Sequence, residues 1–189
     1  MIAAHMGSRV CLVSGHALRK ANLTKITATT LPTRGFASLN VNDALKKQEE
    51  DKHFGDLLGQ PVTILQGIGP KHAEELETLG LKTVDQLADY KFYHLARALL
   101  ILSKVEEADS RGSAAKMNVN KGLDKAYEDL PLSEIVNLPV HALQGITESK
   151  GSLWASLGVK TVADLGQCKY CEWAEAFRVA ARFEEPMDD

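Results

Sequence analysis

The sequence predicts an all-α fold made of two tandem copies of one helical unit. Residue i matches residue i+78 without a gap from 40–110 to 118–188, with 24 identities in 71 positions. Apolar residues recur three and four apart, as at Leu95, Leu99 and Leu102, which is the spacing of an amphipathic helix. No segment shows the strict apolar–polar alternation of a half-buried strand.

The repeat sets the domain organisation. Identical stretches include Leu65-Gln66-Gly67-Ile68 and its copy Leu143-Gln144-Gly145-Ile146, and Lys82-Thr83-Val84 and its copy Lys160-Thr161-Val162. A first unit therefore spans 40–110 and a second spans 118–188. Residues 111–117, with Gly112 and Ser113, are expected to form a short linker between them.

Each unit is expected to open with a helical stretch, over about 41–58 and 119–137. Pro131 should break the second of these, because proline removes a helical hydrogen bond. A hairpin follows at 65–71, where Gly67 and Gly69 would supply the open backbone angles that a tight turn needs.

A helix should follow the hairpin. Pro70 fits its first turn, Ala73, Leu76 and Leu79 share one face, and Gly80 suits its C-terminal end. Thr83 with Gln86, and Thr161 with Asp164, make capping-box patterns for the next helix. A closing amphipathic helix is expected from about Phe92 to Val105, and its counterpart presents Trp173, Phe177 and Ala180.

The first 36 residues differ from the rest of the chain. They contain five basic residues and no Asp or Glu, whereas residues 37–189 carry 17 basic and 25 acidic residues. Basic, hydroxyl-rich and acid-free N-termini are typical of organelle transit peptides. We therefore expect a mitochondrial presequence over 1–36, ending near Phe36, with a disordered basic tail or a plastid address as alternatives.

The chemistry-bearing residues predict no cofactor, no metal site and no enzyme. Cys168 and Cys171 form a single C-x-x-C, whereas a structural zinc site needs four ligands and a thioredoxin-type dithiol needs a βαβ context. The pair is interpreted as two small residues on a partly buried helix face. The six histidines show no metal or triad spacing, and no apolar run reaches the ~20 residues needed to span a bilayer.

The run Gly67-Ile68-Gly69-Pro70-Lys71, with Leu79-Gly80 and Thr83-Val84 after it, resembles the helix-hairpin-helix family. The resemblance covers about 40 residues per unit. In DNA-binding members the hairpin glycines bring backbone N–H groups to a phosphate, the next helix adds its positive end, and a Lys completes the site. By this resemblance Gly67, Ile68, Gly69 and Lys71 form the phosphate-binding hairpin.

The second unit departs from this pattern. Thr147, Glu148 and Ser149 replace Gly69, Pro70 and Lys71, so a carboxylate stands where a phosphate would bind. Both units are acidic, with formal charges of −5 and −4, whereas nucleic-acid binders usually carry a basic stripe. Direct binding of nucleic acid is therefore disfavoured, although it stays open for the first unit.

These observations favour a non-catalytic structural protein of the mitochondrion that docks on partner proteins. It would be an accessory subunit of a larger assembly such as a respiratory complex, ATP synthase or ribosome. Aromatic residues concentrate in the second unit and aromatic residues often carry interfaces, so Trp154, Trp173 and Phe177 are the expected contact residues. Packing of these rings in the core is the alternative, and an organellar DNA- or RNA-binding protein is the alternative function.

Overall fold

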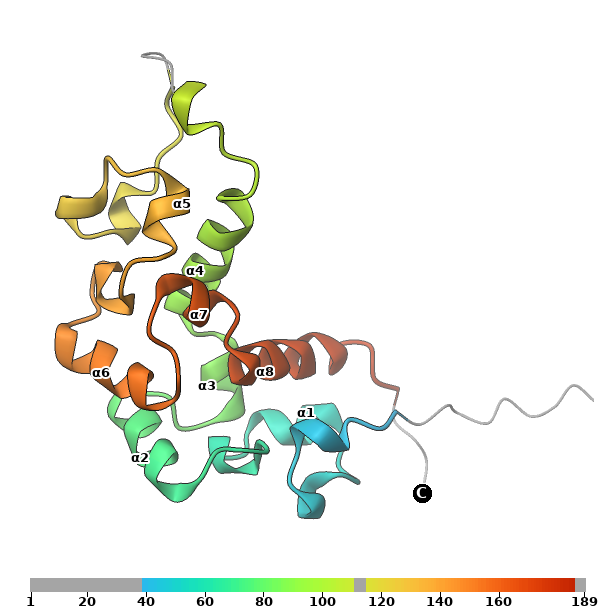
Figure 1. Ribbon diagram of the computed structural model, residues 1–189. Helices are drawn as coiled ribbons and strands as arrows, with labels where there is room; N and C mark the ends of the chain where they lie inside the picture. Colours follow the sequence, from blue (N-terminus) through green and yellow to red (C-terminus); the bar gives the residue numbers. More distant parts are fainter. Residues whose placement is uncertain (1–38, 111–114, 186–189) are drawn as a thin grey trace, which may run out of the picture. The chain divides into compact units, whose positions relative to one another are not determined.

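The computed structural model describes residues 39–110 and 115–185, which belong to one compact unit (Figure 1). The predicted presequence and most of the predicted linker lie outside the described residues. The described residues form α-helices and short 3₁₀ turns and contain no strand, so the all-α prediction is confirmed. Four isolated β-bridges join neighbouring turns.

The first half of this unit contains four α-helices. These are α1 (Phe54–Leu58), α2 (Pro70–Thr78), α3 (Val84–Ala88) and α4 (Lys91–Leu102). Short 3₁₀ turns precede and connect them: η1 (Asn42–Ala44), η2 (Lys47–Glu49) and η3 (Val62–Ile64). A further turn, η4 (Ala108–Ser110), follows α4.

The second half contains the same series of elements. Each begins 78 residues after its counterpart: η5 (Asn120–Gly122), η6 (Lys125–Tyr127), α5 (Leu132–Ile135), η7 (Val140–Ala142), α6 (Glu148–Ser156), α7 (Val162–Gly166) and α8 (Lys169–Ala180). Positions 78 apart are called equivalent below.

The long leading helices predicted over 41–58 and 119–137 are wrong. Only α1 and α5 are α-helical there, because the chain before them forms short 3₁₀ turns and pairs with the hairpin. Leu45 forms a β-bridge with Leu65, and Lys46 N donates to Ile64 O at 2.8 Å. Leu123 and Leu143 form the equivalent bridge. A residue whose backbone groups bond to another segment cannot also continue a helix.

The local signals for helix ends are confirmed. Thr83 with Gln86 and Thr161 with Asp164 form complete capping boxes. Pro131 is the N-cap of α5, so the helical stretch does begin anew there. Gly80 has a φ of 85° directly after α2, where a side chain would be strained. The closing helix ends at Leu102, three residues before the predicted end.

The closing helix of each half packs on the other half. Helix α4 packs on α7 and α5, and helix α8 packs in the equivalent way on α3 and α1. Figure 1 shows α4 beside α5, and α8 above α1. The buried side chains of both halves consequently form one continuous core. The two units predicted from the repeat thus share one core.

Equivalent residues of α4 and α8 meet where the two halves join. The Nη1 atom of Arg97 lies 2.6 Å from Oε2 of Glu175, and these two positions are equivalent. The hydroxyl of Tyr93 donates to the same Glu175 oxygen at 2.8 Å and also bonds Arg97. A copied position has therefore acquired opposite charges in its two copies, which stabilises the pairing of one copy with the other.

Two identical glutamates follow the closing helices and bond across the same junction. Glu106 accepts a hydrogen bond from Leu132 N, the first residue of α5, at 2.6 Å. The equivalent Glu184 accepts from Phe54 N and Gly55 N of α1, at 3.0 and 3.2 Å. Burial alone would raise the pKa of the Glu184 carboxyl, but these N–H groups and His53 together hold that pKa below its usual value. Each half thus satisfies helix N–H groups of the other.

The backbones of α4 and α7 are in close contact. A Cβ added to Gly166 would lie 2.9 Å from both the carbonyl carbon and the oxygen of Ala96. Atoms of a helix backbone cannot move aside as a flexible side chain can. Gly166 is therefore the position that permits α4 to approach α7.

We predict that Gly166→Ala lowers the free energy of unfolding by about 1–3 kcal/mol, the usual cost of overpacking a core. The matched control is Gly55→Ala in α1, where a Cβ has nothing within 4 Å. This control should be neutral or stabilise by up to about 1 kcal/mol. Chemical denaturation of both variants measures the difference, and an equal effect of the two changes would contradict the close contact.

Candidate functional site

In the hairpin of the first half, one glycine has a positive φ and not two. Gly67 has a φ of 95°, and its equivalent Gly145 has 102°. Gly69 is extended, with φ −85° and ψ 172°, and its equivalent Thr147 has nearly the same angles, −75° and 160°. The expectation that Gly69 is needed for its backbone freedom is therefore wrong, since Thr147 adopts the same conformation.

The two hairpins differ in what they offer to an anion. In the first half no side chain caps the start of α2, and Pro70 occupies its first turn as predicted. In the second half the hydroxyl of Thr147 accepts a hydrogen bond from Lys150 N at 3.3 Å and lies 2.9 Å from Ser149 Oγ. The second hairpin thus satisfies its own helix N-terminus, whereas the first leaves N–H groups of α2 without a side-chain partner.

Lysines from both halves surround the first hairpin. Lys46 Nζ donates to Ile68 O at 3.3 Å, and Lys71 is exposed at the start of α2. Tyr170, the second residue of α8, covers Gly67: a Cβ on Gly67 would lie 2.9 Å from its hydroxyl. Lys169 lies 4.9 Å from the centre of the Tyr170 ring.

The second hairpin is surrounded by different residues. Asp124 and Ser149 stand at the positions equivalent to Lys46 and Lys71. Phe92 takes the place of Tyr170, with its Cζ 3.2 Å from a Cβ on Gly145. The exchange of closing helices therefore places one ring over each hairpin, and Lys91 lies 4.6 Å from the Phe92 ring as Lys169 lies beside Tyr170. The hydroxyl of Tyr170 and the lysines at 46 and 71 are what distinguish the first hairpin from the second.

The four predicted hairpin residues are not equally accessible. Gly67 and Lys71 are exposed and Gly69 is half-buried, whereas the Ile68 side chain is buried in the core. Ile68 can meet a ligand only through its backbone. The sequence reasoning missed Lys46, Lys169 and Tyr170, because no linear motif links them to the hairpin.

Two of the three aromatic residues predicted to contact a partner lie in the core. Trp154 is fully buried, and its Nε1 donates to the hydroxyl of Tyr90 at 3.3 Å. Phe177 is 4% exposed and packs on Phe54, with ring centroids 5.7 Å apart. Trp173 is half-buried against the core. Trp154 and Phe177 therefore stabilise the fold and do not form a docking surface, which corrects the prediction.

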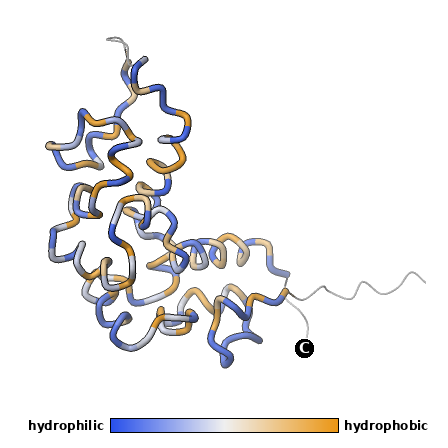
Figure 2. Tube along the Cα trace, in the orientation of Figure 1, coloured by the Kyte–Doolittle hydropathy of each residue, from blue (hydrophilic) through white to orange (hydrophobic). Residues whose placement is uncertain are grey.

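The large apolar side chains that are exposed lie elsewhere. Among residues 39–110 and 115–185, three equivalent pairs account for all of them but Leu102: Leu39 and Met117, Ile101 and Val179, and Val105 and Phe183. The last two pairs lie at the ends of α4 and α8, where Val105 is 74% and Phe183 81% exposed. Figure 2 shows apolar residues continuing to the ends of both helices. We call Ile101, Leu102 and Val105 the α4 tip, and Val179 and Phe183 the α8 tip.

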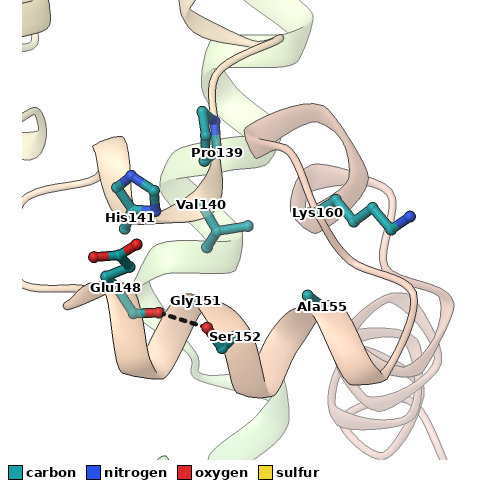
Figure 3. Close-up of a pocket in the computed structure, with 8 residues that line it drawn as sticks. All are labelled: Pro139, Val140, His141, Glu148, Gly151, Ser152, Ala155 and Lys160. Carbon is teal, nitrogen blue, oxygen red and sulfur yellow. Dashed lines mark hydrogen bonds between the residues drawn. The ribbon is translucent and has the colours of Figure 1, made fainter.

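A shallow pocket of about 200 Å³ lies between η7 and α6 (Figure 3). His141 and Glu148 line one side, Lys160 lines the other, and Gly151 forms part of the floor. A Cβ on Gly151 would lie 3.6 Å from the Cβ of His141, so the absence of a side chain there deepens the pocket. The equivalent positions in the first half are Thr63, Pro70, Lys82 and Ala73.

Within residues 39–110 and 115–185, no group of three or more His, Cys, Asp or Glu side chains is arranged to hold a metal ion. No described helix combines the length and the apolarity needed to cross a membrane. Comparison of the chain with protein-family models, curated proteins and solved structures gives no match.

We predict that Gly67→Ala destabilises the protein by about 1–3 kcal/mol, because alanine is strained at this φ and its Cβ meets Tyr170. The matched control is Gly69→Thr, which copies the equivalent residue of the second half. It should change the free energy of unfolding by no more than about 1 kcal/mol, because Thr147 already adopts this conformation as an N-cap. Equal losses in thermal unfolding would contradict this description of the hairpin.

Proposed function

We propose that this chain is a non-catalytic docking protein of the mitochondrion, an accessory subunit of a larger assembly such as a respiratory complex, ATP synthase or ribosome. The observation that carries the proposal is the exposure of apolar side chains at the α4 tip and the α8 tip. Both helices end in exposed apolar side chains, and these lie at equivalent positions of the two halves. Grouped exposed apolar residues are typical of surfaces that contact another molecule.

Exposed apolar side chains at the two tips cost free energy as long as they stay in contact with water. Scattered single apolar residues on a surface need no explanation. Here Ile101 and Val179 lie in the last turns of α4 and α8, and Val105 and Phe183 lie in the turns that directly follow, so each tip contains a pair of exposed apolar side chains within five residues. A partner that covers such a pair gains about 25 cal/mol for each Å² of apolar surface removed from water.

The second hairpin supports docking over a phosphate-binding role shared by both halves. Thr147 and Ser149 satisfy the start of α6, and Glu148 adds a negative charge there. The acidic balance of both halves opposes a polyanionic ligand. The proposal of a mitochondrial address depends on the basic, acid-free composition of residues 1–36.

The proposal predicts that the two tips hold the protein in its assembly. In the fourfold variant Ile101→Ser, Val105→Ser, Val179→Ser, Phe183→Ser, the tagged protein should move on a native gel from a high-mass complex to its own mass. The wild-type protein should stay in the complex. Because the four side chains are exposed, the melting temperature of the purified variant should change little.

The matched control is Lys47→Ser with Lys125→Ser, which changes two exposed and equivalent residues away from the tips. This control should remain in the complex. Migration of the wild-type protein alone, at its own mass, would overturn docking altogether. Retention of the fourfold variant in the complex would overturn the assignment of the surface.

A second candidate function is binding of organellar DNA or RNA by the first hairpin. Its support is the uncapped start of α2 with Lys46, Lys71 and Lys169 close to it. The purified protein should then be retained on duplex DNA at about 50 mM salt, and Lys71→Glu should abolish retention, since phosphate contacts strengthen as salt falls. No retention at this permissive salt concentration would exclude this function.

A further inference from the structure

The pocket between η7 and α6 is bordered on α6 by residues that are smaller than their equivalents in the first half. Gly151 stands where the first half has Ala73, and Ala155 stands where it has Glu77. A Cβ on Gly151 would come within 3.6 Å of the Cβ of His141, across the pocket floor. Both replacements therefore remove side-chain atoms from the wall of the pocket and widen it.

One of these replacements also leaves a cation at the edge of the pocket without its partner. In the first half Glu77 pairs with Lys82, with Oε1 and Nζ 2.6 Å apart. The equivalent residues of the second half are Ala155 and Lys160, and alanine offers no carboxylate. Within residues 39–110 and 115–185, Lys160 forms no ion pair, and the Asp164 carboxylate accepts its backbone N–H group at 3.0 Å. The Lys160 ammonium group can therefore bind a carboxylate of a ligand.

The other side of the pocket carries the opposite charge. Glu148, the first residue of α6, replaces Pro70 there, and Figure 3 shows its carboxylate beside His141 and away from Lys160. In the part of the chain that the structure describes, Glu148 has no ion-pair partner either. The apolar residues between the two charges are Pro139, Val140 and Ala155. The pocket thus has an anion on one side, a cation on the other, and an apolar surface between them.

We propose that this pocket binds an ω-amino acid, a zwitterion with an ammonium group at one end, a carboxylate at the other and methylene groups between them. The ammonium group binds Glu148, the carboxylate binds Lys160, and the methylene groups lie on the apolar surface. A ligand with an anionic group alone would be repelled by Glu148, and one with a cationic group alone would be repelled by Lys160. This binding is independent of docking by the α4 tip and the α8 tip.

The size and the exposure of the pocket set the size of the ligand and the strength of binding. The volume of about 200 Å³ is below the roughly 300–1,000 Å³ of pockets that take drug-sized ligands, so the ligand is a small molecule. Glu148 and Lys160 are exposed, and ion pairs that water surrounds contribute little each. Binding is therefore expected in the millimolar range.

The test is an NMR titration of the isotope-labelled full-length chain with ε-aminocaproate, which is an ω-amino acid. The backbone amide signals of Gly151 and Ala155 should shift and reach saturation in the millimolar range. The signals of Ala73 and Glu77, at the equivalent positions of the first half, should stay in place. Caproate lacks the ammonium group and hexylamine lacks the carboxylate, so each of these two probes should bind at least tenfold more weakly than ε-aminocaproate.

A variant that copies the first half should close the site. Ala155→Glu supplies Lys160 with the partner that Lys82 has in Glu77, so ε-aminocaproate should bind at least tenfold more weakly. Ala155 is exposed, and unchanged amide signals away from α6 verify that the variant is folded. The matched control is Glu77→Ala in α2, which should leave the affinity unchanged.

Three results would each overturn the proposal. The first is that the signals of Gly151 and Ala155 do not move with ε-aminocaproate. The second is that caproate or hexylamine binds as tightly as ε-aminocaproate, because the pocket would then not recognise both charges. The third is that Ala155→Glu, in its folded state, binds as tightly as the wild-type protein.

Discussion

The central constraint on the described structure is that each closing helix packs on the opposite half, which brings α4 so close to α7 that no room is left for a side chain on Gly166. The same arrangement places α8 on α1 and α3. About 70 residues make a marginal core on their own, because a small unit buries a small share of its surface. Exchange of the closing helices joins the two halves into one core, and each half supplies a helix that the other lacks.

The exchange also explains which copied residues stayed alike and which diverged. Glu106 and Glu184 are identical, and each caps the short helix of the opposite half. Arg97 and Glu175 meet each other across the junction, so opposite charges at this one position are favourable. The hairpins are where the copies differ most in chemistry, because Thr147, Glu148 and Ser149 stand where the first half has Gly69, Pro70 and Lys71.

Local patterns predicted much of the fold. Thr83 and Thr161 begin helices, Gly80 ends one, and Pro131 separates two segments, because each effect depends on residues within one turn. The prediction of a long leading helix was wrong because the backbone around Leu45 bonds to a segment twenty residues away. The prediction that Trp154 contacts a partner was wrong for a similar reason. The residue type suggested an interface, but only the fold shows that the ring lies against Tyr90. The predicted hairpin turn is present at Gly67, which has a positive φ. Its neighbours Lys46, Lys169 and Tyr170 come from parts of the chain that no short motif connects.

Helix exchange is tested most directly by cutting the chain between its halves. A protease site is introduced at residues 111–114, and the folded protein is cleaved without denaturant. The peptide chain is then cut between the halves, while the packing contacts between them remain. We predict that the two fragments co-elute on size exclusion as one species and unfold in one transition, because α4 and α8 each remain seated on the other half. Elution of two separate folded fragments, each with its own transition, would show that each half completes its own core and would contradict the exchange.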